Sequence, residues 1–499
     1  MSQKIVIRAD GGTDLGMGHI IRCLALADML REDFIILFAV QSTQKSLLKF
    51  IHSVTATVVH LPPTIDFLED AKYFSDYLSP DDIVILDGYH FNTEYQKIIK
   101  SKCAKLVSID DLHSWHQFAD VVINHAGGIS ATDYSTESYT QLCLGPRYAL
   151  LRKEFLSDKF KRGKISSIEK VFISMGASDV NNITSKFVSA LSAFNSIKEI
   201  HLMLGTINPN LESLDQQIKS ASGIKIFRHF DIPAEELKSL LNSCDISICP
   251  ASSISIESCA VGIGLLTGHT AANQLSILDG LMMNKAAINL GDLKLISVDE
   301  IQQQLSPLIK NPQLLETLIT NQAIMIDGHS PKRFRELFKK LTPVKLQFRM
   351  ANEADLDQYY KWANDELVRE QSYNQNKVSL EEHRNWFGSK LNSPDCFFYL
   401  FHDQKNTPVG QVRIDKSSGE IIIGISIDHD HRGKNLGKPM LEKAYKHYFS
   451  KNPEAIIYAY IKNANYASYA AFKKAGFIDQ EEIEVHGVKS YKLYKKSDQ

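Results

Sequence analysis

The sequence predicts an α/β protein with two doubly wound lobes followed by a smaller α+β domain. Its 499 residues are too many for one hydrophobic core, and about three core-sized units are expected. Residues 1–330 alternate Val- and Ile-rich runs with amphipathic segments, which is the pattern of parallel strands covered by helices on both faces. After about residue 345, short apolar runs follow one another with turn residues between them, which favours antiparallel strands.

The first lobe is predicted to span residues 1–152, with strands at Lys4–Asp10, Phe34–Val40, Asp82–Gly88, Lys105–Asp111 and Val121–Gly127. The second lobe, residues 165–330, repeats the pattern with strands at Lys170–Gly176, Ile197–Gly205, Gly223–Phe230, Asp245–Ala251, Ile263–Gly268 and Ala286–Asp292. In such sheets ligands bind at the carboxyl ends of the strands, so we expect a ligand in the cleft between the lobes.

The third unit is predicted at residues 346–496. The segment Gly328–Val344 indicates a closing helix followed by a Pro-bearing linker, and the linker between domains is placed at 331–345. Beyond it the expected strands are Leu346–Ala351, Cys396–His402, Pro408–Asp415 and Ile421–Ile427, with helices at Asp355–Ala363 and Leu380–Leu391.

Composition excludes several classes of protein. The formal net charge of -2 gives no electrostatic reason to expect nucleic acid or an anionic membrane as a partner. No apolar run reaches the roughly 20 residues of a membrane-spanning helix, and the first residues lack a signal-peptide pattern, so we expect a cytoplasmic protein. The 7 cysteines are scattered without CxxC pairs, which argues against a disulfide framework and against a zinc site. The composition makes no prediction of the oligomeric state.

A glycine-rich loop follows the first predicted strand. The segment Arg8–Arg22 reads RADGGTDLGMGHIIR, with the strand ending at Asp10 and a helix starting near Gly18. Glycines let backbone amides approach a ligand, and a helix N-terminus favours an anion. His19 at the helix start is expected to face the crevice, where a neutral imidazole can take a proton from water. The alternative is a histidine that only packs against or caps the helix.

The second lobe carries matching features after its strands. The segment Pro250–Ala260, PASSISIESCA, places Ser252 and Ser253 at a helix start, where hydroxyls and backbone amides suit a diphosphate. Glu257 follows one turn later, where its carboxylate can accept hydrogen bonds from a ribose diol, unless it is simply a solvated helix residue. Gly176 lies in another junction of strand and glycine loop, KVFISMGASD, at the same end of the sheet.

Motifs within residues 1–330 resemble the UDP-sugar hydrolase family of pseudaminic acid biosynthesis. In order they are RADGGTDLGMGHIIRCLALA, LDGY, SMGASD, PASSISIES and TAANQ. The resemblance implies the two-lobed glycosyltransferase B fold and hydrolysis of UDP-2,4-diacetamido-2,4,6-trideoxy-β-L-altropyranose to UDP and the free sugar. It also implies that no metal is needed and that water attacks the anomeric carbon with inversion. One departure is Ala177, which stands in SMGASD where a second glycine is common.

Carried over by position, the family's base falls on His19 within GMGH, its cleft tyrosine on Tyr89 within LDGY, and its uridine-ribose carboxylate on Glu257. Tyr89 would hold the sugar or the attacking water, and the alternative is a half-buried packing aromatic. The other predicted substrate-binding residues of this part are Gly18, Arg22, Gly176, Ser252, Ser253, Asn273 and Gln274.

The C-terminal unit contains a second phosphate-binding pattern. Ile421–Leu441, IIIGISIDHDHRGKNLGKPML, predicts a strand, a basic glycine-containing loop and a helix, whose amides and dipole suit a pyrophosphate. Asn463–Phe477, NANYASYAAFKKAGF, adds an asparagine, a helix and a Gly-Phe stop. Together these resemble the GNAT acyltransferase superfamily, which implies acetyl-CoA as co-substrate; the alternative is a basic surface turn. The predicted cofactor-binding residues are Arg432, Gly433, Lys434, Asn435, Leu436, Gly437 and Asn465.

Two positions bear on the acetyl transfer itself. Many members of the superfamily place a tyrosine where this chain has Phe472, so Tyr469, one turn earlier, is the candidate catalytic acid. The alternatives are a packing role for Tyr469 and a thiolate that leaves without a dedicated acid. The stretch Arg349–Ser372 resembles acetyltransferases that act on 4-amino nucleotide sugars. It predicts Trp362, with Asn364 and Arg369, on the acceptor side, unless Trp362 is the core residue of an amphipathic helix.

The sequence therefore predicts a bifunctional enzyme. The acetyltransferase would acetylate the 4-amine of UDP-4-amino-4,6-dideoxy-N-acetyl-β-L-altrosamine, and the hydrolase would release UDP from the product. One alternative is a glycosyltransferase of the same two-lobed fold fused to an acetyltransferase of unrelated amine specificity. The other is a non-catalytic nucleotide-sugar sensor.

Overall fold

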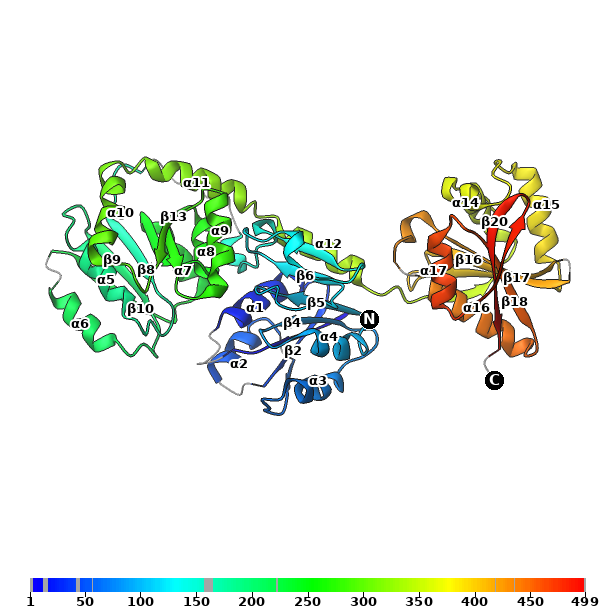
Figure 1. Cartoon of the computed structure of the whole chain (residues 1–499), viewed down its shortest axis with the longest axis horizontal. Helices are drawn as coiled ribbons and strands as arrows, with labels where there is room; N and C mark the ends of the chain where they lie inside the picture. Colours follow the sequence, from blue (N-terminus) through cyan, green and yellow to red (C-terminus); the bar gives the residue numbers. More distant parts are fainter. Residues whose placement is uncertain are drawn as a thin grey trace. The chain divides into compact units, whose positions relative to one another are not determined.

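The structure is a computed structural model that describes residues 3–11, 17–41, 45–55, 57–156, 165–220, 223–417, 419–434 and 436–497. The chain forms two compact units, Met1–Thr342 and Pro343–Gln499 (Figure 1). Among the described residues, none of the helices combines the length and the apolar character that crossing a bilayer requires.

The first unit begins with a parallel sheet of strand order β3-β2-β1-β4-β5-β6-β7. Its strands are β1 (Lys4–Ala9), β2 (Ile35–Val40), β3 (Val58–His60), β4 (Ile83–Asp87), β5 (Lys105–Ile109), β6 (Val121–Asn124) and β7 (Gln141–Leu144). The helices between them are α1 (Gly18–Leu30), α2 (Lys45–His52), α3 (Phe67–Ser75) and α4 (Thr93–Lys100).

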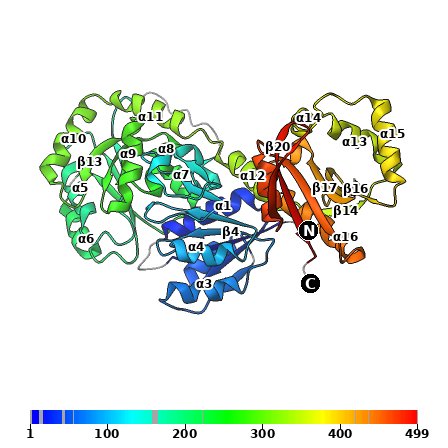
Figure 2. The same ribbon diagram turned by 45° about the vertical axis from the view of Figure 1, so that its right-hand side comes forward.

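Both faces of this sheet are buried, as the continuous apolar runs predict. Ile5 and Ile7 of β1 pack in a core with α1 and α2, whereas Val6, on the other face, packs with α3 and α4. Figures 1 and 2 show these helices around the strands.

The second lobe has a parallel sheet of strand order β10-β9-β8-β11-β12-β13. Its strands are β8 (Lys170–Ser174), β9 (Glu199–Leu204), β10 (Lys225–Phe230), β11 (Ile246–Pro250), β12 (Gly264–His269) and β13 (Ile288–Asp292). One face is covered by α5 (Ile183–Leu191), α6 (Leu211–Ser220), α10 (Val298–Lys310) and α11 (Leu314–Met325). The other is covered by α7 (Ala234–Ser243), α8 (Ser253–Val261) and α9 (Leu275–Met283).

The chain then returns to the first lobe. Helix α12 (Ser330–Leu341) follows the second lobe, yet Phe334 and Phe338, both 0% exposed, pack in the core of the first sheet with Ile5 and Ile7. Most of the segment 331–345, predicted as linker, is therefore a buried helix, and only the few residues after Leu341 remain to connect the two units.

The two lobes also meet directly through glycines. The Gly128 amide donates a hydrogen bond to the Ser276 carbonyl over 3.0 Å. A Cβ added at Gly280 would lie only 2.4 Å from the Cα of Gly127, so no side chain fits at this contact. The backbone just after β6 is therefore fixed against α9 of the second lobe.

The second unit has a mixed sheet of order β14-β15-β16-β17-β18-β20-β19. Its strands are β14 (Gln347–Met350), β15 (Cys396–His402), β16 (Pro408–Ser417), β17 (Glu420–Ile427), β18 (Ile456–Lys462), β19 (Ile478–Val485) and β20 (Val488–Lys496). Its helices are α13 (Leu356–Ala363), α14 (Glu366–Gln371), α15 (Leu380–Leu391), α16 (Gly437–Lys451) and α17 (Tyr466–Lys474).

Helices cover both faces of this sheet. Helices α16 and α17 pack in the core on one face, and α13 and α15 pack with Phe398 and Leu400 of β15 on the other. Figure 2 shows α13, α14 and α15 together. Two parallel α/β sheets followed by a mixed sheet agree with the predicted fold class.

Candidate functional sites

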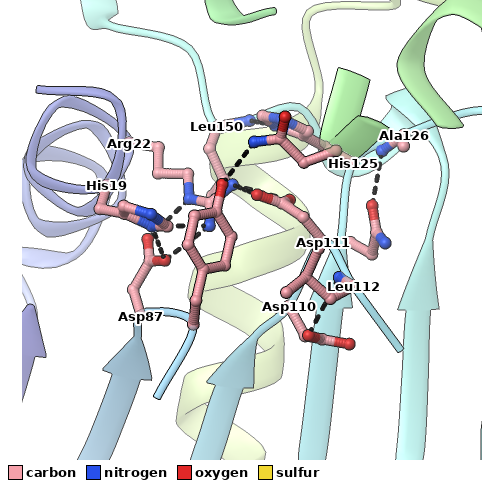
Figure 3. Close-up of polar contacts among 12 residues, drawn as sticks. His19, Arg22, Asp87, Asp110, Asp111, Leu112, His125, Ala126 and Leu150 are labelled. Atoms are coloured by element: carbon pink, nitrogen blue, oxygen red, sulfur yellow. Dashed lines mark hydrogen bonds and ion pairs between the residues drawn. The ribbon is translucent and has the colours of Figure 1, made fainter. Parts of the chain in front are cut away.

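The carboxyl ends of neighbouring strands in the first sheet bring polar side chains together (Figure 3). Asp87 is the last residue of β4, Asp111 follows β5, and His125 follows β6. His19 lies in the first turn of α1, the helix that follows β1. Because β1, β4, β5 and β6 are adjacent and parallel, these residues lie in a row at the carboxyl ends of the strands.

His19 is oriented by a carboxylate. Its Nδ1 lies 2.6 Å from Oδ1 of Asp87, and the two side chains are 7% and 0% exposed. Nη2 of Arg22 also lies 3.1 Å from this Nδ1, but it donates to Asp87 over the shorter distance of 2.6 Å. A carboxylate only accepts, so the shorter contact of Nδ1, with Asp87, places the hydrogen of the neutral ring on Nδ1 and leaves Nε2 with a lone pair. The Tyr89 ring meets the His19 ring edge-on, with 4.6 Å between ring centroids. This is the arrangement expected of a general base whose tautomer is fixed by a partner.

Arg22 holds the carboxylates in place. Its Nη2 and Nε donate to Asp87 over 2.6 and 2.7 Å, and its Nη1 donates to Asp111 over 2.6 and 2.7 Å. Burial raises the pKa of Asp87, but Arg22 and His19 outweigh it and hold that pKa well below its usual value. The guanidinium of Arg22 therefore fixes Asp87 and Asp111, and its role in substrate binding stays a prediction.

Asp87 and Asp111 were missed by the sequence reasoning. Both stand at the end of a buried apolar run, IVILD and LVSIDD, and the parallel order puts those ends side by side. A search for carboxylates at the ends of predicted parallel strands would have found them.

In the second lobe, Glu257 is already paired. It is 5% exposed, and its two carboxylate oxygens accept from Nε and Nη2 of Arg152 over 2.8 and 3.0 Å. Burial raises the pKa of Glu257, and Arg152 partly offsets that rise. The carboxylate predicted to bind ribose is therefore held by an arginine that the sequence analysis did not consider.

The other predicted residues of the second lobe lie at the carboxyl ends of its strands. Ser252 and Ser253 begin α8 directly after β11. Gly176 follows β8 with φ of +85°, and a Cβ there would meet no described atom within 4 Å. These positions leave backbone exposed at a helix start and in a glycine turn, as anion binding requires.

Tyr89 and Asn273 connect the lobes. The Asn273 amide nitrogen donates to the Tyr89 hydroxyl over 2.7 Å, and Tyr89 is 37% exposed. Gln274 is engaged locally, because its side-chain oxygen accepts from the Thr270 amide over 2.7 Å. Gly18, at the start of α1, leaves open space where a Cβ would meet no described atom within 4 Å.

Within the described ranges, no group of three or more His, Cys, Asp or Glu side chains is arranged to hold a metal ion.

The predicted pyrophosphate loop of the second unit joins β17 to α16. Gly433 has φ of +75°, and Lys434 is exposed. Leu436 is the N-cap of α16 without a side-chain hydrogen bond, so no described side chain caps the first turn that begins at Gly437. The loop therefore fits a phosphate-bearing co-substrate through its backbone. Asn435 lies outside the described residues.

Arg432 and Asn465 both make hydrogen bonds within the second unit. The Arg432 guanidinium turns back, donating from Nη2 to Asp365 over 2.7 Å and from Nε to the Ile427 carbonyl over 3.1 Å. The Asn465 side-chain oxygen accepts from the Ser468 amide over 3.1 Å and caps α17. Both side chains stabilise the local fold, although Nη1 of Arg432 is buried with no hydrogen-bond partner among the described residues. Their contacts with the co-substrate stay predictions.

Tyr469 is also engaged. Its hydroxyl donates to Oδ2 of Asp479 over 3.1 Å, and its ring lies 4.5 Å from that of Tyr491, centroid to centroid. Desolvation and the contact with Asp479 raise the pKa of Tyr469. These contacts favour the packing interpretation over the catalytic acid.

Trp362 lies in the core and not on an open acceptor surface. It is 3% exposed, and its indole nitrogen donates to Oδ2 of Asp428 over 2.8 Å. Asn364 and Arg369 bond to backbone carbonyls of the following loop. These contacts favour the amphipathic-helix alternative for Trp362, and its contact with substrate stays a prediction.

The strands next to the loop separate. β17 and β18 pair at Ile421–Ile457 and Ile422–Tyr458, and their described ladder ends there although both strands continue. A Cβ on Gly424, two residues later, would meet no described atom within 4 Å. The diverging strands expose backbone groups beside the predicted pyrophosphate loop.

Comparison with known proteins finds relatives of both parts of the chain. Residues 345–478 match the family described as "Acetyltransferase (GNAT) domain". An uncharacterised protein of Methanocaldococcus jannaschii is 26% identical over 499 residues, covering 95% of this chain and 96% of its own length. The spore coat polysaccharide biosynthesis protein SpsG of Bacillus subtilis is 22% identical over 339 residues, 67% of this chain and 97% of its own length.

Two further proteins resemble the N-terminal part. The protein named UDP-2,4-diacetamido-2,4,6-trideoxy-beta-L-altropyranose hydrolase in Campylobacter jejuni is 27% identical over 259 residues, 50% of this chain and 86% of its own length. MurG of Acinetobacter baumannii superposes with a TM-score of 0.51 at 13% identity, covering 68% of this chain and 99% of that one, which shows a shared fold. The chain therefore joins an N-terminal part of glycosyltransferase B fold, homologous to SpsG and to that hydrolase, to a C-terminal GNAT acetyltransferase domain.

Proposed function

We propose that residues 1–342 hydrolyse UDP-2,4-diacetamido-2,4,6-trideoxy-β-L-altropyranose to UDP and the free sugar. The observation that carries the proposal is the His19–Asp87 pair, in which Nδ1 is bound to a carboxylate 2.6 Å away and Nε2 can accept a proton. The homologue of that name in Campylobacter jejuni supports the choice of substrate.

In the proposed reaction, a water oxygen bonds to the anomeric carbon while the bond from that carbon to the UDP oxygen breaks. His19 takes the proton that the water loses, and Asp87 stabilises the imidazolium that forms. UDP leaves as the anion. Ser252, Ser253 and the glycine turn at Gly176 would hold its phosphates, and Glu257 its ribose.

We also propose that the GNAT domain uses acetyl-CoA to acetylate the 4-amine of the precursor UDP-4-amino sugar. The backbone around Gly433 and Gly437 would hold the pyrophosphate, and the separating strands after Ile422 would accommodate the thioester. The amine attacks the thioester carbonyl, loses a proton, and coenzyme A leaves as thiol or thiolate. The contacts of Tyr469 support a reaction without a dedicated tyrosine acid.

The hydrolase is tested with the full-length chain, the diacetamido UDP-sugar and no acceptor. UDP release should be rapid, and His19→Ala should slow it by about a hundredfold or more, the usual contribution of a positioned base. His52→Ala, at an exposed histidine of α2, is the matched control and should not change the rate. Turnover by His19→Ala near that of wild type would remove His19 from the mechanism. UDP release that requires an added acceptor would instead indicate a glycosyltransferase.

The acetyltransferase is tested by adding acetyl-CoA and the 4-amino UDP-sugar, following thiol release, and identifying the product by NMR. Acetylation at the 4-nitrogen is the expected result. Thiol release that is independent of the UDP-sugar would refute this substrate.

A further inference from the structure

His125 is a buried histidine that the proposed reaction does not use. It follows β6 directly and is 4% exposed. Its Nδ1 lies 3.3 Å from the backbone nitrogen of Leu150, which donates to it. Gly127, two residues later, contacts Gly280 of α9 in the second lobe. The side chain of His125 therefore lies near the contact between the two lobes.

The contact with Leu150 fixes the tautomer. A backbone N–H can only donate, so Nδ1 of His125 must accept, and the hydrogen of the neutral ring is on Nε2. Burial, followed by the charge of Arg22, lowers the pKa of His125 to about 4. The ring is therefore neutral near pH 7, and Nε2 is a hydrogen-bond donor with no partner among the described residues.

His19 and His125 thus both lie at the carboxyl ends of the strands of the first sheet. Their neutral rings are opposite tautomers. His19 presents a lone pair at Nε2 because its Nδ1 donates to Asp87. His125 presents a hydrogen at Nε2 because its Nδ1 accepts from Leu150. One ring can take a proton from water, and the other can only donate a hydrogen bond to an oxygen atom.

We propose that His125 donates a hydrogen bond from Nε2 to an oxygen atom of the sugar part of the nucleotide sugar. This inference rests on the proposed hydrolase function. The acceptor is a hydroxyl oxygen or an acetamido carbonyl oxygen, both of which accept, whereas the ammonium group of an amino sugar only donates. The sugar part is chosen because His125 lies in the row of strand ends that includes Asp87 and Asp111, whereas the expected UDP contacts lie in the second lobe.

Two variants distinguish the proposed hydrogen bond from Nε2 to the sugar from the structural contact of Nδ1 with Leu150. His125→Asn places an oxygen near the Nδ1 position, where it can still accept from Leu150, but the side chain ends short of Nε2. His125→Gln reaches the Nε2 position with an amide that can donate. We expect kcat/KM for UDP release from the diacetamido UDP-sugar to fall about tenfold in His125→Asn and to recover in His125→Gln, with kcat changed little. The affinity for UDP should be unchanged in both variants.

The choice of substrate identifies the oxygen. If the contact is with the 4-acetamido carbonyl, His125→Asn reduces the preference of the hydrolase for the diacetamido sugar over the 4-amino sugar. If the contact is with another sugar oxygen, both substrates lose the same factor. An unchanged kcat/KM in a folded His125→Asn variant overturns the proposal, and so does an equal loss of affinity for UDP, which would place the contact on the diphosphate.

The test remains decisive under two complications. If wild-type protein releases no UDP, the proposed hydrolase function fails, and calorimetry with the unreacted UDP-sugar still compares His125→Asn with wild type. If His125→Asn does not fold, His125→Gln carries the test, because its affinity for the UDP-sugar should stay within about threefold of wild type, and a tenfold loss refutes the donor role.

Discussion

Asp87→Asn is the substitution that tests the candidate base most directly. Asp87 lies 2.6 Å from Nδ1 of His19, and it is 0% exposed. When His19 takes a proton, the imidazolium has a carboxylate as its immediate counter-charge. Asparagine keeps the shape of Asp87 and removes that charge.

The magnitude follows from Coulomb's law. With charge centres about 4 Å apart and an effective dielectric constant of about 20, the pair is worth about 4 kcal/mol. Losing that stabilisation in the transition state corresponds to about a thousandfold in rate. If the asparagine amide donates to Nδ1, the ring reverses its tautomer, and the loss approaches about 10⁴-fold, as in other His–carboxylate pairs.

The assay is kcat for UDP release, with the melting temperature measured in parallel. Asp111→Asn is the matched control, because either variant leaves Arg22 with a single carboxylate, but only Asp87→Asn removes the partner of His19. Both should melt at similarly reduced temperatures, while kcat falls much further in Asp87→Asn. A folded Asp87→Asn protein with kcat within a fewfold of Asp111→Asn would refute the reasoning.

Four further outcomes are expected. Glu257→Gln should weaken UDP binding in calorimetry by about 1.5–3 kcal/mol, the value of a hydrogen bond to a charged group, and an unchanged affinity would exclude the ribose contact. Tyr469→Phe should keep acetyl transfer within about threefold of wild type because the hydroxyl is already bound to a carboxylate, whereas a loss of about a hundredfold would identify the acid. Cleavage between Thr342 and Pro343 should yield two folded, separately active pieces, and a folded but inactive N-terminal piece would show that the units depend on each other. The free energy of unfolding should fall by up to about 3 kcal/mol as the pH drops from 6.5 to about 4, because His125 takes up a proton in the unfolded chain and not in the folded chain. In denaturant titrations, His125→Asn should remove this part of the pH dependence of the free energy of unfolding.

Local sequence could propose only those parts of the candidate site that depend on one motif. His19 could be found because glycines, a strand end and a helix start lie within a few residues of it. Its partner Asp87 lies 68 positions away, and only the order of the strands brings the two together. The pairing of Glu257 with Arg152, across 105 positions, is a similar case. Such pairs depend on tertiary packing, which no local pattern contains.

The strands were predicted best where burial makes them apolar. β15, expected at Cys396–His402, has those bounds in the structure. The short strands β3 and β7 at the edges of the first sheet, Val58–His60 and Gln141–Leu144, were missed because edge strands are partly exposed and carry a weak pattern. Trp362 was predicted on the acceptor side from the resemblance of Arg349–Ser372 to acetyltransferases of 4-amino nucleotide sugars, with a core position as the alternative. Helical spacing alone does not distinguish the two, because an aromatic side chain fits a core as well as a ligand site.

The return of α12 to the first sheet bears on how the protein is made. Ile5 leaves the ribosome about 330 residues before Phe334, which at 5–20 residues per second is roughly 15–65 s. During that interval one face of the first sheet is covered by α1 and α2 but lacks α12, and Phe334 and Phe338 are fully buried only once α12 has docked. The first lobe is therefore completed only after the second lobe has been synthesised, and an unfinished chain that stops before Ser330 would expose apolar surface to chaperones and to other unfinished chains.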